Sequence, residues 1–224
     1  MQKRTRKSLW AFGLLALFAV GVGLYALVVY GNPDHIRESM FVTEKGELPE
    51  LWYSMLWVHA VSAGLALGIG WVQWIKRLRQ RAVNVHRVIG GAYAAGITLA
   101  GVTGLYLSYY ADGGWIGRTG FAMLSVMWLY TLYRGLQSMI VRRDLQAHGA
   151  WMLRNYALTC AAITLRIYMP LAAVLFGLGT NESFVVIAWL AWLPNLLLAE
   201  RWIRRSRNRN LMRRLQQTRS AMRR

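Results

Sequence analysis

Residues 148–170, HGAWMLRNYALTCAAITLRIYMP, combine an apolar composition with four side chains suited to ligand binding: His148, Arg154, Asn155 and Arg166. Imidazole nitrogens ligate metals and accept hydrogen bonds, and guanidinium groups bind carboxylate and phosphate oxygens at two points. A charge that faces lipid at mid-membrane depth costs on the order of 3 kcal/mol. If this segment spans a membrane, its polar side chains must therefore face other helices or a ligand.

The helical period places four of the polar side chains of this segment on one stripe, His148, Asn155, Thr159 and Arg166. We expect this stripe to face the interior of a helix bundle. Pro170 cannot donate a hydrogen bond to the carbonyl of Arg166, and its ring clashes with that carbonyl. The sequence therefore predicts a kink there, with a free acceptor beside a buried cation.

Counting residues from the membrane edges sorts the other polar groups by depth, at about 1.5 Å per helical residue. His59 and Arg166 fall in an outer layer. An inner layer collects His86, His148, Arg134, Arg154, Asn195 and Glu200.

The elements that carry these residues are long and apolar. The chain of 224 residues is 56 % hydrophobic, and a helix needs about 20 apolar residues to cross a bilayer core of about 30 Å. Because the apolar runs are not strand-like and their connections are short, we expect an all-α membrane bundle of six transmembrane helices. It would form one domain over 1–203, followed by a basic tail over 204–224. The six runs cover 8–30, 51–75, 88–110, 119–140, 151–178 and 184–203.

The formal charge of +18 is unevenly distributed along the chain. Of the 27 Lys and Arg residues, 21 lie in 1–7, 76–87, 141–150 and 201–224, whereas the opposite loops hold seven of the nine acids. This asymmetry predicts that both termini are cytoplasmic. A basic tail directly after a span favours anionic lipids as its partner, at about 1 kcal/mol per basic residue, and makes nucleic acid an unlikely one.

One hypothesis for the polar groups is a haem b site for electron transfer, with His86 and His148 as axial ligands from two helices. Arg154, Arg134 or Arg87 would then neutralise its propionates. Asp144 precedes His148 by one helical turn and is a candidate to orient its imidazole. His59 has no histidine at its own depth, so a second bis-histidine haem lacks a ligand.

Two further hypotheses need no redox chemistry. In the first, Arg166 and His59 hold a carboxylate, a quinone or a lipid headgroup in an outward cavity of a binding or transport protein. In the second, the chain is a structural subunit of a membrane complex, and the polar groups only join helices, with Glu200 paired to Arg154. The sequence contains no CxxC or HExxH motif, no nucleotide-binding glycine pattern and no hydrolytic triad, so it does not support an ordinary enzyme class.

The segments LWVHAVSAGLALGIGWVQW, VHRVIGGAY, HGAWMLRNYALTCAAITLRIYMP and WLAWLPNLLLAE resemble a family of bacterial six-helix predicted membrane proteins of unknown function, over about residues 50–203. The H-x-x-W-M-x-R-x-Y motif from His148 to Tyr156 is the most specific part. The resemblance implies a location in the bacterial inner membrane and no particular activity. It directs attention to His59, His86, His148, Arg154, Arg166, Asn195 and Glu200.

The chain is also loosely similar to di-haem cytochromes of the b561 type, which carry four helix-borne histidine ligands in two pairs. Only His59, His86 and His148 are available on the expected spans here. The similarity therefore implies at most the inner haem.

Overall fold

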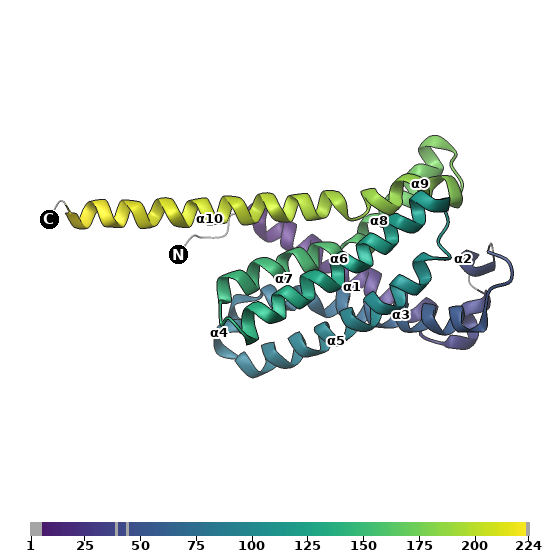
Figure 1. Ribbon diagram of the computed structural model, residues 1–224, viewed down its shortest axis with the longest axis horizontal. Helices are drawn as coiled ribbons and strands as arrows, with labels where there is room; N and C mark the ends of the chain where they lie inside the picture. The colour runs from purple at the N-terminus through teal and green to yellow at the C-terminus, as the bar shows by residue number, and fades with distance from the viewer. Residues whose placement is uncertain (1–5, 39, 44, 223–224) are drawn as a thin grey trace.

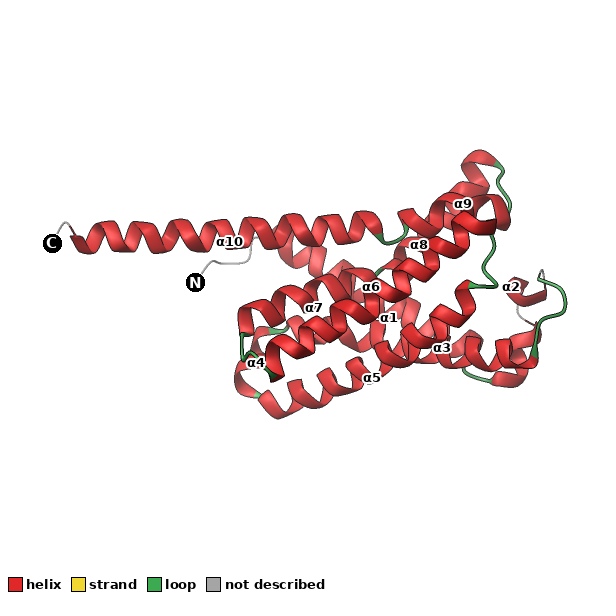
Figure 2. Cartoon of the chain, viewed as in Figure 1, coloured by secondary structure: helices red, strands yellow, loops and turns green. Residues whose placement is uncertain are grey.

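A computed structural model describes residues 6–38, 40–43 and 45–222, and every regular element in this part of the chain is helical (Figures 1 and 2). Short loops join the helices. The elements are α1 (Arg6–Tyr30), η1 (Pro33–Glu38), α2 (Met40–Thr43), α3 (Glu50–Gly70), η2 (Trp71–Trp74), α4 (Lys76–Arg81), α5 (Val83–Ser108), α6 (Gly114–Ile140), α7 (Leu145–Thr159), α8 (Ala161–Phe176), α9 (Thr180–Leu190) and α10 (Leu193–Met222).

Five stretches in the described residues are long and apolar enough to cross a membrane: Leu9–Tyr30, Glu50–Trp74, Val83–Ser108, Leu145–Phe176 and Thr180–Arg209. The run expected at 119–140 forms α6, which is not among the five. α6 packs against α5, α7 and α9 and buries several small polar residues, including Ser125, Thr131 and Ser138, against them. Those serines and threonines lower the mean hydropathy of α6. They are tolerated within the bundle because neighbouring helices pack against them.

Small residues bring the first three long helices close together. α3 packs between α1 and α5. A Cβ added to Gly23 of α1 would lie 2.8 Å from the carbonyl oxygen of Gly64 in α3, and one added to Gly96 of α5 would lie 3.0 Å from the carbonyl oxygen of Ser62. These glycines therefore lie on the surfaces where the helix backbones meet.

The fifth predicted span is two helices rather than one kinked helix. The boundary falls at Cys160, before the position where a kink is predicted, and α8 includes Pro170 within its length. Threonine hydroxyls occupy the carbonyls around the boundary: Thr159 Oγ1 donates to Asn155 at 3.0 Å, and Thr164 Oγ1 donates to Cys160 at 3.1 Å. These bonds stabilise a turn within an apolar span by satisfying its backbone.

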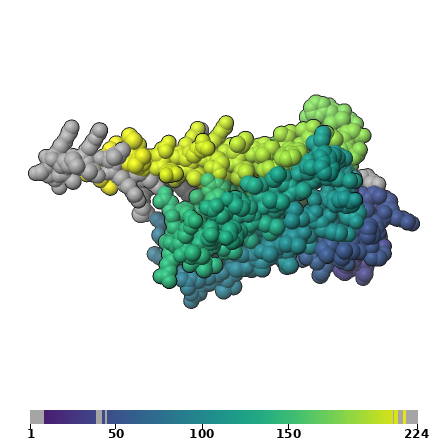
Figure 3. Space-filling model, in the orientation of Figure 1, coloured from purple at the N-terminus to yellow at the C-terminus, as the bar shows by residue number. Residues whose placement is uncertain are grey.

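The sixth predicted span is also interrupted, because α9 ends at Leu190 and α10 begins at Leu193. Pro194 lies in the first turn of α10, where a missing N–H is tolerated. α10 then continues without a break into the basic segment and projects past the bundle at the end where α4 lies (Figures 1 and 3). The last two residues of the expected tail, 223–224, lie outside the described residues.

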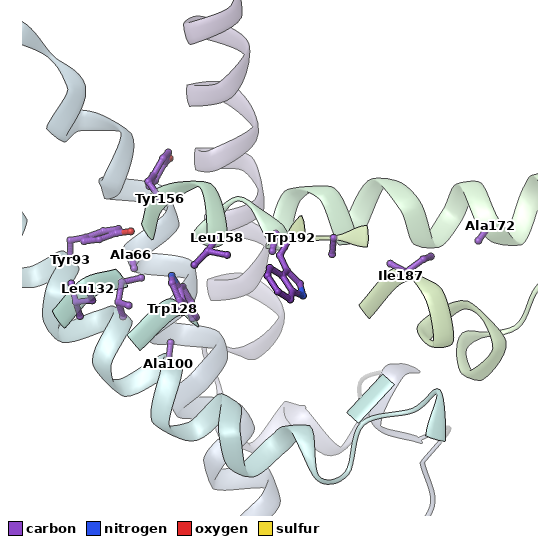
Figure 4. Packing of buried hydrophobic residues seen from close by; sticks show 13 residues of the cluster. Ala66, Tyr93, Ala100, Trp128, Leu132, Tyr156, Leu158, Ala172, Ile187 and Trp192 are labelled. Atoms are coloured by element: carbon purple, nitrogen blue, oxygen red, sulfur yellow. The ribbon is translucent and has the colours of Figure 1, made fainter. Parts of the chain in front are cut away.

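The main core lies between α3, α5, α6 and α7. Tyr93, Trp128, Leu132 and Tyr156 gather there, and the rings of Tyr93 and Tyr156 have their centroids 6.3 Å apart (Figure 4). Tyr93 is 1 % exposed and Tyr156 is 4 % exposed. The core therefore contains large polar-tipped aromatics, whose hydroxyl groups need partners.

Candidate functional site

A cavity of about 590 Å³ lies among α1, α3, α5, α6 and α8. Its wall is mostly apolar and includes Leu56, Leu67, Leu124 and Leu165. It extends from the loops beside α2 and α9 to Trp128 in the middle of the bundle. Cavities of this size and composition accept small, mainly apolar ligands.

Arg166 of α8 supplies the cavity with a positive charge. One of its terminal nitrogens donates to the carbonyl of Ala162 at 3.0 Å, and its Cζ lies 5.2 Å from the centroid of the Tyr25 ring. No carboxylate among the described residues forms a salt bridge with this guanidinium. Its remaining N–H groups are therefore free to bind an anion or a carbonyl oxygen.

His59 of α3 lines the same cavity. Its Nδ1 lies 2.8 Å from the carbonyl oxygen of Ala100, and because a carbonyl only accepts, Nδ1 carries the proton. In the neutral imidazole Nε2 is then an acceptor, and it has no hydrogen-bond partner among the described residues. Gly104 leaves room for this ring, since a Cβ there would lie 3.1 Å from His59 Cε1.

The loop end of the cavity carries a second cation, which is neutralised. Lys45 Nζ lies 2.7 Å from Asp112 Oδ2 and donates to the Tyr110 carbonyl at 3.1 Å. The Lys45 side chain is only 7 % exposed, so this pair is held inside the loops. Arg166 is consequently the cation of the cavity wall that lacks a carboxylate partner in the described part of the chain.

A hydrogen-bonded network fills the space beside the cavity floor. Tyr93 Oη donates to Asn155 Oδ1 at 2.6 Å and lies 2.9 Å from Thr159 Oγ1, which also accepts from Trp128 Nε1 at 2.9 Å. Asn155 Nδ2 donates to the Trp128 carbonyl at 2.8 Å and to Thr131 Oγ1 at 2.9 Å. Asn155 is fully buried, and its amide is committed to other helices.

His86 of α5 and His148 of α7 lie at the opposite end of the bundle, each in the first turns of its helix. His148 Nδ1 donates to the Gly135 carbonyl at 2.8 Å, which leaves Nε2 as its ligand nitrogen. His86 Nδ1 is buried and has no partner among the described residues. The cavity described above includes neither imidazole.

Asp144 does not orient the His148 imidazole, contrary to the expectation from their spacing. Its carboxylate caps α7 instead and accepts from the backbone N–H groups of Gln146 and Ala147, both at 2.9 Å. An aspartate directly before a helix satisfies donors of the first turn in this way. The Gly135 carbonyl takes the orienting role.

The remaining inner-layer candidates pair with each other or with neighbouring helices. Arg154 forms a two-point salt bridge with Glu200, in which Nη2 and Oε2 are 3.1 Å apart. Asn195 Nδ2 donates to Thr164 Oγ1 at 2.8 Å and to the Ala191 carbonyl at 3.1 Å. These contacts join α10 to α7 and α8.

The break at Cys160 divides the polar stripe of residues 148–170. Asn155 and Thr159 belong to the buried network, whereas Arg166 belongs to the cavity with His59. Sequence reasoning missed Tyr25 and Tyr30, which bring α1 to the cavity wall. Their signal is weak, because tyrosines near a helix end also fit a membrane interface. No group of three or more His, Cys, Asp or Glu residues in the described part of the chain is placed to hold a metal ion.

An all-helical bundle with several apolar spans and buried polar groups defines an integral membrane protein. The family model described as "Predicted membrane protein (DUF2306)" matches residues 56–203, and the chain belongs to that family. No curated protein and no solved structure matches the chain.

Proposed function

We propose that the protein binds an amphipathic ligand in the cavity, with the anionic or carbonyl-bearing head of the ligand held by Arg166 and His59. The observation that carries this proposal is the absence of a carboxylate partner for Arg166 in the described residues, although this cation lines an apolar cavity. A buried cation without a counter-charge is costly, and an anionic ligand removes that cost.

The wall of the cavity favours a ligand with an apolar body. Leucines line the space below Arg166, and Trp52 and Trp128 add aromatic surface. Burial of apolar ligand surface contributes about 25 cal/mol per Å², and the head group supplies orientation. A long-chain carboxylate satisfies Arg166 by charge, whereas a quinone satisfies it through a neutral carbonyl oxygen.

The proposal includes an orientation in the membrane. We place α6 across the bilayer as a sixth span, because it packs between α5 and α7 over its length. Both termini are then on the side of the basic turns, which is the cytoplasm of a bacterial inner membrane. The cavity faces outward, and the basic part of α10 meets anionic lipids.

Titration of the detergent-purified protein with palmitate and with a short-chain ubiquinone tests the proposal. We expect saturable binding of at least one probe, and Arg166→Gln weakens palmitate binding by at least about tenfold through loss of a charge-assisted bond. The matched control is Arg118→Gln, which removes the same charge at the same end of the bundle. Arg118 is exposed and does not line the cavity.

Two results would contradict the proposal. The first is the absence of saturable binding of either probe by protein stripped of lipid. The second is an equal loss of palmitate affinity in Arg166→Gln and Arg118→Gln.

A second candidate function is haem b binding at His86 and His148. It is favoured by the buried, unpartnered Nδ1 of His86 and by the Gly135 carbonyl that orients His148. The imidazoles of His86 and His148 would hold the iron, and Arg154 would neutralise a propionate. When bound, the haem would supply one-electron transfer.

An absorption spectrum of the protein expressed with ample haem, before and after dithionite, tests this candidate. Haem binding gives a Soret band that shifts on reduction and is lost in His86→Ala and in His148→Ala. A featureless spectrum would leave the cavity as the functional site.

A further inference from the structure

The indole of Trp151 in α7 lies within cation–π distance of two guanidinium groups. The Cζ atom of Arg134 in α6 is 4.9 Å from the Trp151 ring centroid, and the Cζ atom of Arg154 is 4.5 Å from it. The Tyr130 ring meets the same indole edge-on, with centroids 5.8 Å apart. Aromatic faces attract cations and fix their planes, so this arrangement holds both guanidinium groups near one place.

The two arginines differ in how far their donors are used. Arg154 is engaged at two points by Glu200. Arg134 donates one hydrogen bond, to Tyr130 Oη at 2.9 Å, and its buried Nε has no partner within the described part of the chain. Arg134 therefore retains donors that an oxygen-rich group can occupy.

The local charge is positive. Glu200 is the carboxylate paired with Arg154 in this cluster, whereas Arg134 contacts the same indole as Arg154 and has no carboxylate partner among the described residues. Arg134 lies about 9 Å along the axis from the end of α6 at Ile140, at 1.5 Å per residue. Its guanidinium bonds to Tyr130, one helical turn further from that end, so a headgroup that binds it enters beside α6 and α7 rather than over the end of α6.

We propose that Arg134, supported by Trp151 and Arg154, binds the phosphate group of an anionic phospholipid headgroup. Phosphate offers several oxygens to the fork of Arg134, and its negative charge offsets the excess of the cluster. The acyl chains lie outside the bundle, on the side where Tyr130 is 42 % exposed. This site is separate from the cavity of Arg166, because none of its residues lines that cavity.

The test measures the thermal unfolding midpoint of the full chain in neutral detergent during three separate titrations. The titrants are dioleoylphosphatidylglycerol, dioleoylphosphatidylcholine and inorganic phosphate. For the wild type we expect a saturable rise with phosphatidylglycerol, at a concentration about tenfold lower than any rise with phosphatidylcholine. Inorganic phosphate alone is expected to give no rise at that concentration.

Variants distinguish a built site from general surface charge. Arg134→Gln is expected to raise the half-saturating concentration of phosphatidylglycerol about tenfold. Arg142→Gln removes an equal charge from the exposed turn that follows α6 and is expected to change it by less than about twofold. Arg134→Lys keeps the charge but loses the planar fork, so an intermediate rise of about threefold is expected.

Equal effects of Arg134→Gln and Arg142→Gln would overturn the site, and so would equal responses to the two lipids. A full response to inorganic phosphate alone would show that Arg134 binds phosphate, but it would contradict the proposal that a lipid supplies the phosphate. If Arg134→Gln shows no cooperative transition, Arg134→Lys decides, and a response like that of the wild type would contradict the proposal.

Discussion

Two polar regions lie next to each other in the bundle, and they differ in whether their hydrogen bonds are satisfied. In the network of Tyr93, Asn155 and Thr159, each polar side chain bonds to another part of the bundle. In the cavity, the Nε2 of His59 and most donors of Arg166 have no partner among the described residues. In the first region, which we call the closed region, the protein itself satisfies the polar groups. In the second, the open region, polar groups remain without a partner among the described residues.

This difference separates polar groups that hold helices together from polar groups available to a ligand. A buried amide that meets its partners on other helices fixes helix rotation and depth. A buried guanidinium without a counter-charge lowers stability and is retained where something else binds it. Both regions are polar. The candidate site therefore differs from the network in that its polar side chains lack hydrogen-bond partners.

The largest effect on stability is expected when a side chain of the hydrogen-bonded network is removed. Asn155→Ala removes the acceptor of Tyr93 and the donor to Thr131, and we expect it to lower the free energy of unfolding by about 2–3 kcal/mol. Arg166→Gln is expected to leave that free energy unchanged or to raise it, because it removes a charge without a counter-charge and breaks no ion pair. Equilibrium unfolding in mixed detergent micelles measures both.

Asn195→Ala provides the matched control for Asn155→Ala. Its amide makes a single bond to another helix, at Thr164, and one bond within its own turn of the chain. A loss of about 1 kcal/mol is expected. Equal losses in the two asparagine variants would show that the network is worth no more than one interhelical bond.

An intermediate effect on the free energy of unfolding is expected at the Arg154–Glu200 pair. In this pair a carboxylate neutralises a guanidinium at the other end of the bundle. The two side chains are 18 % and 30 % exposed. Glu200→Gln is expected to lower the free energy of unfolding by about 1.5 kcal/mol, since it leaves a partly buried arginine without its carboxylate.

Glu50→Gln is the control for that substitution, because the Arg37–Glu50 pair has side chains that are 53 % and 81 % exposed. Less than about 0.5 kcal/mol is expected there. Thermal or denaturant unfolding of the two variants side by side decides the matter, and equal values would mean that the Arg154–Glu200 pair behaves as a solvated one.

Much of the fold follows from the sequence, because long apolar runs without strand-like alternation predict helices. The depth count that places His59 with Arg166 needs only the rise per residue, and the structure places both in one cavity. The division at Cys160 was not predictable in this way, since residue counting assumes an unbroken helix. The partners of Asn155 depend on how three helices, α5, α6 and α7, are rotated, which one sequence does not specify.

The smallest effect, on ligand affinity, is expected from a substitution that narrows the cavity without removing a polar group. A Cβ at Gly104 would lie 2.8 Å from Ser125 Oγ and 3.1 Å from His59 Cε1, so Gly104→Ala displaces the imidazole from the cavity wall. We expect palmitate affinity to fall about fivefold, equivalent to about 1 kcal/mol. Gly91→Ala on the same helix meets no atom within 4 Å and is expected to leave the affinity unchanged. If Gly104→Ala also leaves it unchanged while Arg166→Gln abolishes binding, the head of the ligand contacts Arg166 alone, and His59 is part of the wall rather than of the recognition site.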